Sequence, residues 1–60
     1  MIENLIFMKD QAMKNMPEYN LEILEVFNDA VELFNVGRNE LAEQTLHEEI
    51  AHLTELYNAN

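Results

Sequence analysis

Residues 21–36 read LEILEVFNDAVELFNV, and this stretch decides the fold of the chain. At about 100° per residue, the rotation of an α-helix, its apolar side chains fill one half of a helical wheel and its polar side chains fill the other. The apolar half contains Ile23, Leu24, Val26, Phe27, Ala30, Val31, Leu33 and Phe34. An apolar face this wide exceeds what one neighbouring helix can cover. We therefore expect a central helix that packs against more than one neighbour.

The segments on either side also have helical spacing. Residues 2–15 carry apolar side chains within an arc of about 160° on the wheel. Residues 40–57 carry two adjacent stripes, which together cover about half of the wheel. One stripe contains Ala42, Leu46, Ile50, Leu53 and Tyr57, and the other contains Leu41, Thr45, His52 and Leu56. Three helices are therefore predicted.

Local signals mark the helix ends. Pro17 ends the first helix because it lacks a backbone N–H and disfavours helical geometry at Met16. Gly37 suits a left-handed residue after the central helix, and Asn39 is a favourable N-cap for the next. We expect one domain over residues 1–60, with helices at about 2–15, 18–36 and 40–57. The short second link predicts an antiparallel hairpin.

The chain is too short to bury much apolar surface alone. It has no cysteine, which excludes disulfides and thiolate zinc sites. Three short helices with such broad apolar faces leave surface that they cannot hide among themselves. We therefore predict an all-α fold assembled as a dimeric helical bundle. The expected core and dimer residues are Leu5, Met13, Leu24, Phe27, Val31, Phe34, Leu46, Ile50, Leu53 and Tyr57.

Acidic residues outnumber basic residues by 12 to 3, which gives a net charge of −9. This charge argues against direct binding to nucleic acid or to an anionic membrane, and it favours a protein partner with a basic surface. The first residues, MIENLIF, contain an acid where a signal peptide needs a base, and no apolar run approaches the ~20 residues of a membrane span. We expect a cytoplasmic protein. Its eight asparagines hint at an AT-rich genome, such as that of a low-GC bacterium or its phage.

Two charged residues interrupt the apolar arcs. Lys9 lies within the arc of the first helix, and Glu49 projects between the two stripes of the third. Since a charge buried alone is costly, the two are predicted to pair with each other, or else to extend their charged ends from the edge of the core. His52 is expected to be a half-buried, hydrogen-bonded polar residue.

Glu49 and His52 form an E-x-x-H sequence within LHEEIAHLTEL, residues 46–56. This run resembles the metal-ligand helix of ferritin-like and rubrerythrin-like proteins, which implies that Glu49 and His52 would bind a metal across a dimer. A complete site of that kind needs two further inward glutamates, and the other helices place their glutamates off their apolar faces. The sequence therefore predicts no cofactor, and a metal-binding helical dimer is the alternative.

Nothing in the sequence predicts an enzyme. The chain has no serine or cysteine nucleophile, and one glycine cannot build a phosphate-binding loop. No acid and base are placed to share a pocket, and a chain of this size has little room to exclude water from one. We expect no catalytic residues.

The polar half of the central helix carries an acidic ridge of Glu22, Glu25, Asp29 and Glu32. No basic residue lies between Lys14 and Arg38. Neighbouring carboxylates are spaced by about 4.5–6 Å of helical rise, so the ridge can imitate a phosphate backbone or steer toward a basic surface. A ridge that only keeps the protein dissolved is the alternative.

Phe7 lies outside the apolar arc of its helix and is the expected apolar docking residue. Together with the acidic ridge, it predicts a small protein–protein interaction module, a regulator or inhibitor that binds a host protein. A structural assembly subunit is a further alternative.

Overall fold

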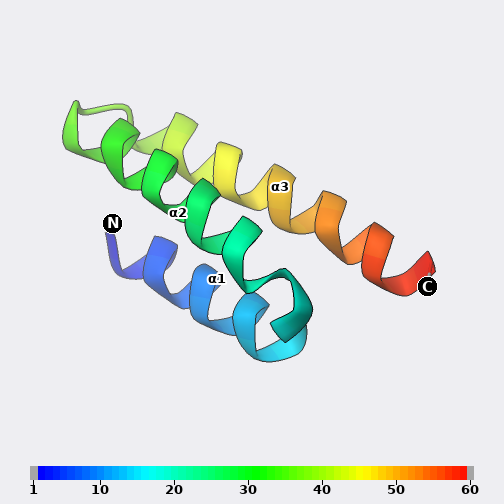
Figure 1. The fold of residues 1–60 in the computed structure, drawn as a ribbon. Helices are drawn as coiled ribbons and strands as arrows, with labels where there is room; N and C mark the ends of the chain where they lie inside the picture. Colours follow the sequence, from blue (N-terminus) through cyan, green and yellow to red (C-terminus); the bar gives the residue numbers. More distant parts are fainter. Residues whose placement is uncertain (1, 60) are drawn as a thin grey trace.

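The computed structural model describes residues 2–59. Its elements are α1 (Ile2–Asn15), the 3-10 helix η1 (Pro17–Tyr19), α2 (Asn20–Asn35) and α3 (Asn39–Ala59). Figure 1 shows the three α-helices running side by side, with α2 antiparallel to α1 and α3. The all-α fold and the α2–α3 hairpin are confirmed over these residues. The dimer stays a prediction.

A Schellman motif closes α2. The N–H of Gly37 donates to the carbonyl of Phe34 at 3.0 Å, and the N–H of Arg38 donates to the carbonyl of Leu33 at 2.9 Å. This pairing of the last carbonyls requires a left-handed residue, and Gly37 has a φ of 87°. The chain therefore reverses within a few residues, which brings α3 back along α2.

The other helix ends differ slightly from the predicted ones. The chain continues from Pro17 as a 3-10 turn, in which the N–H of Tyr19 donates to the carbonyl of Met16 at 2.9 Å, so α2 begins at Asn20. The carbonyl of Arg38 accepts the first hydrogen bond of α3, from the N–H of Ala42 at 2.9 Å. Asn39 is therefore the first helical residue and not the cap before it.

The core consists of two clusters along the bundle. The first contains Leu5, Ala30, Ala42 and Leu46, and the second contains Ala12, Met16, Ile23 and Leu53. Ile50 packs against both. The largest fully buried side chains are Leu5, Ile23 and Leu46, one from each helix. Each of the three α-helices thus contributes at least one large, fully buried side chain to the core.

The predicted core residues are buried to different degrees. Leu5, Leu46 and Leu53 are buried. Met13, Phe27, Val31, Phe34 and Ile50 are partly buried. Leu24 and Tyr57 are exposed, at 38% and 40%. Leu24 lies at the edge of an apolar face wider than α1 and α3 cover, and Tyr57 lies on the last turns of α3, which extend past the ends of α1 and α2 (Figure 1).

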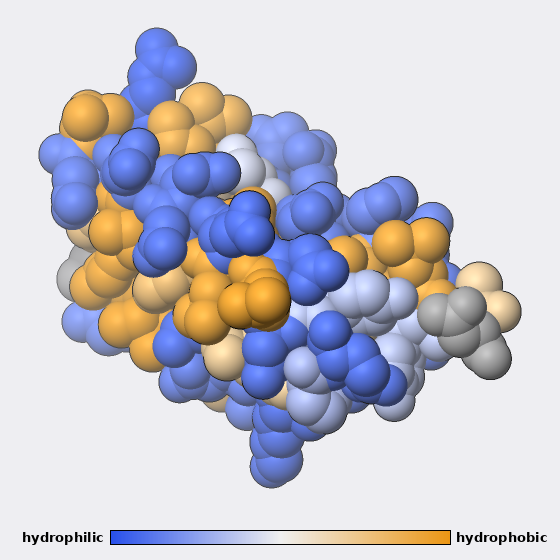
Figure 2. Space-filling view, in the orientation of Figure 1, coloured by the Kyte–Doolittle hydropathy of each residue, from blue (hydrophilic) through white to orange (hydrophobic). Residues whose placement is uncertain are grey.

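Several other large apolar side chains reach the surface. They are Ile6, Phe7, Leu21, Val36, Leu41 and Leu56. Figure 2 shows apolar residues over the N-terminal half of α1, surrounded by hydrophilic residues. None of the described helices is both long and apolar enough to cross a membrane. The apolar surface is therefore distributed in patches along helices that also carry many charges.

Candidate protein-binding surfaces

The acidic ridge lies on the solvent side of α2. Glu22, Glu25, Asp29 and Glu32 are all exposed. Their spacing of three, four and three residues keeps them on one face of the helix. Exposed carboxylates at this spacing create a negative field that extends about a Debye length, roughly 8 Å at physiological salt, into the solvent.

Lys9 is paired differently from the prediction. Its Nζ atom lies 2.7 Å from Oδ1 of Asp10 and 5.1 Å from the centre of the Phe27 ring. The aliphatic part of the side chain can follow the apolar surface while the ammonium remains beside Asp10 and over the ring, which avoids burying the charge. Lys9 thus follows the alternative of a charge at the edge of the core, with Asp10 and not Glu49 as its ion-pair partner.

His52 also differs from the prediction, because its side chain is exposed and not half-buried. It belongs to the α3 stripe that includes Leu41 and Leu56, and those two leucines are exposed as well. The other helices leave this stripe largely uncovered. Glu49 is half-buried.

A metal site within one chain finds no support in this arrangement. Across residues 2–59, no three side chains of His, Cys, Asp or Glu come together in a group that could hold a metal ion. Glu49 and His52 are one turn apart on α3, and two ligands fall short of the four that a structural zinc site uses. Within residues 2–59 of one chain, no further metal-binding side chains come together with the E-x-x-H sequence.

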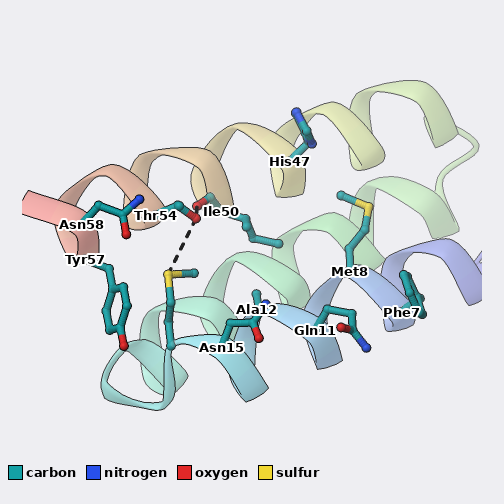
Figure 3. Close-up of a pocket in the computed structure, with 11 residues that line it drawn as sticks. Phe7, Met8, Gln11, Ala12, Asn15, His47, Ile50, Thr54, Tyr57 and Asn58 are labelled. Carbon is teal, nitrogen blue, oxygen red and sulfur yellow. Dashed lines mark hydrogen bonds between the residues drawn. The ribbon is translucent and has the colours of Figure 1, made fainter.

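A groove of about 380 Å³ lies between α1 and α3. Its α1 side consists of Phe7, Met8, Gln11, Ala12, Asn15 and Met16. Its α3 side consists of His47, Ile50, Thr54, Tyr57 and Asn58. Figure 3 shows Phe7 and Met8 at one end and Tyr57 and Asn58 at the other, with α2 behind them. We call this cavity the α1–α3 groove.

Thr54 helps to shape one end of the groove. Its hydroxyl donates to the carbonyl of Ile50 at 2.7 Å, and it lies 3.7 Å from the sulfur of Met16 (Figure 3). The first bond satisfies the hydroxyl within its own helix. The contact with the sulfur joins α3 to Met16, the residue that follows α1.

A second hollow, of about 360 Å³, adjoins the groove at its Phe7 end. Met8 and His47 line both, and Glu40, Glu43 and Gln44 complete the second. Glu43 also accepts a hydrogen bond from Asn4 at 3.5 Å, which links α3 to α1 here. The α1–α3 groove therefore passes from apolar side chains into an acidic end.

Phe7 and Tyr57 both line this groove, at its opposite ends, and Phe7 is 65% exposed. Four other lining residues were not predicted from the sequence as binding residues: Gln11, Asn15, His47 and Asn58. Gln11 and Asn15 follow Phe7 at intervals of four, and Asn58 follows His47 after about three turns. This helical spacing was visible in the sequence, but it did not say which helices face each other.

Comparison of the chain with protein families, curated proteins and solved structures finds no significant match. Functional proposals for this protein therefore depend on its own surfaces.

Proposed function

We propose that this protein is a small acidic interaction module that regulates or inhibits a protein with a basic surface. The observation that carries this proposal is that Glu22, Glu25, Asp29 and Glu32 are all exposed on one face of α2. No basic residue interrupts them, and Lys9, one of the chain's three basic residues, is already held by Asp10 and Phe27. The ridge thus presents four carboxylates with no basic residue between them along α2.

The overall charge strengthens the argument. A net charge of −9 on 7.1 kDa produces a field that attracts a basic surface and accelerates encounter with it. Regularly spaced carboxylates on a rigid helix also resemble the phosphates of a nucleic-acid backbone. A DNA- or RNA-binding protein is accordingly the favoured class of partner within this proposal.

We predict that binding to this partner is strongly salt-dependent and depends on the ridge. The partner is first identified by affinity capture from the native host and mass spectrometry, and its Kd is then measured by fluorescence anisotropy. Raising NaCl from about 50 to 500 mM should weaken binding more than tenfold, because ions screen exposed charges. Replacing Glu22, Glu25, Asp29 and Glu32 with their amides should also weaken binding by at least about tenfold.

The matched control neutralises four exposed carboxylates elsewhere. Glu3, Glu18, Glu48 and Glu55 replaced by glutamine change the net charge by the same amount but leave the ridge intact. If the two variants weaken binding equally, only total charge matters and the ridge is not the binding surface. Binding that is unaffected by salt would reject the whole proposal.

We propose that the module acts as a homodimer. The single chain buries few side chains, and it leaves Leu24, Leu41 and Leu56 exposed on the sides of α2 and α3 where the sequence predicted broad apolar faces. Burying apolar surface of this kind stabilises by about 25 cal/mol per Å². The partner of these leucines is therefore a second copy of the chain.

Sedimentation equilibrium checks this expectation. We predict a dimer at micromolar concentration and a shift toward monomer in Leu24→Glu/Leu56→Glu, whose changes place charges on that surface. Leu21→Glu, at a more exposed position on α2, is the comparison. A native chain that sediments as a monomer at these concentrations would contradict the dimer without affecting the acidic ridge.

A further inference from the structure

We propose that the α1–α3 groove receives an amphipathic helix of the basic partner, which lies along α1 and α3 as a fourth helix. Its apolar side chains occupy the groove between Phe7 and Tyr57, and a cationic residue reaches the acidic end at Glu40. This inference rests on the proposed function and assigns a specific site and binding mode to it.

The dimensions of the groove suit a helix. From Phe7 to Asn15, α1 rises about 12 Å, and from His47 to Asn58, α3 rises about 16 Å, at 1.5 Å per residue. A helix of about ten residues has the same length. Side chains of neighbouring helices pack as ridges into grooves, and a furrow between two helices offers rows for apolar anchors at i, i+3 or i+4, and i+7.

The chemistry of the groove changes along its length. Ala12 and Ile50 are apolar, Met8 and Met16 are adaptable, and flexible methionines suit variable apolar anchors. Gln11, Asn15 and Asn58 add neutral amides to the lining. Carboxylates enter only in the adjoining hollow, through Glu40 and Glu43. The matching ligand is therefore apolar over most of its length and positively charged at one end.

A second copy of this chain fits this groove less well than a basic helix. The sequences of α2 and α3 contain no lysine or arginine, and α1 balances Lys9 and Lys14 against Glu3 and Asp10. None of the helices of a second copy thus offers an excess of positive charge to the acidic end. Charge complementarity favours a different, basic protein.

The probe is a labelled peptide of about 16 residues, with leucines at i, i+3 and i+7, two arginines at one end, and alanine and glutamine elsewhere. A peptide of identical composition with the leucines scattered around the helix is the control, because it has the same charge. By fluorescence anisotropy, the native protein should bind the leucine-stripe peptide at least tenfold more tightly than the control.

Variants locate the site. Phe7→Ala and Tyr57→Ala should each raise the Kd of the stripe peptide about tenfold, whereas Leu21→Ala, which is 75% exposed and outside the groove, should not change it. Glu40→Lys should weaken binding several-fold more than Glu22→Lys, although both change the net charge equally. These positions are exposed, so circular dichroism should show intact helices in all variants. If Tyr57→Ala does not fold, Phe7→Ala decides the result.

Three outcomes would overturn this inference. The first is equal binding of the two peptides. The second is an equal rise in the Kd of the stripe peptide in Glu40→Lys and Glu22→Lys. Either result would assign binding to the charged surface alone and leave the proposed function standing. The third is a homodimer that dissociates in Phe7→Ala and does not bind the peptide, which would assign the groove to a second copy. Failure of salt-dependent partner binding, by contrast, would reject the proposed function itself.

Discussion

Leu46→Ala is expected to remove a large part of the free energy of unfolding of the protein. The Leu46 side chain is fully buried and belongs to the cluster with Leu5, Ala30 and Ala42. Replacing a buried leucine with alanine costs about 2–5 kcal/mol, because apolar contacts are lost and a cavity remains. At about 0.05–0.15 kcal/mol per residue, a domain of this length has only about 3–9 kcal/mol of stability in total. One such cavity removes much of that reserve.

Urea denaturation followed by circular dichroism measures this effect. Leu56→Ala is the matched control, because it makes the same change on the same helix at a side chain that is 44% exposed. The control should lose less than about 1 kcal/mol, since partly exposed leucines contribute less burial. Equal unfolding midpoints for the two variants would show that Leu46 does not anchor the core. Both should be measured at one protein concentration, because a dimer makes stability concentration-dependent.

The helices and the hairpin could be predicted because their signals are local. Pro17 and Gly37 affect the backbone only within a few residues. The helical pattern of residues 21–36 can be read from the order of apolar and polar residues alone. The start of α2 differs from the prediction because the residues from Pro17 form a 3-10 turn before α2 begins. That turn depends on how the chain crosses from α1 to α2, which is a tertiary property.

The candidate sites were harder to predict, because a helical wheel gives the direction of a side chain but not its neighbour. Predicting that Lys9 lies over the Phe27 ring required knowing that α1 packs beside α2 at that level. Predicting that His52 is exposed required knowing that no other helix covers its stripe on α3. The α1–α3 groove is likewise a property of two helices that are far apart in the sequence.

Ala42→Leu is expected to destabilise the protein by about 1–3 kcal/mol through overpacking. Ala42 and Ala30 are both fully buried in the first core cluster, where α2 and α3 meet. Two small side chains allow the helices to approach closely, and a leucine at either position would force them apart. Ala51→Leu makes the same change at an exposed position of α3 and should alter the free energy of unfolding by less than about 0.5 kcal/mol.

The double variant Ala42→Leu/Leu46→Ala tests whether the two effects share one space. Residues 42 and 46 are one turn apart on α3 and belong to the same cluster, so the added leucine can occupy volume that the lost one vacated. Neighbouring core changes of this kind couple by about 0.5–3 kcal/mol. The double variant should therefore be more stable than the sum of the single losses predicts. Strict additivity in urea denaturation would mean that the two side chains occupy separate spaces and that the first cluster is not continuous along α3.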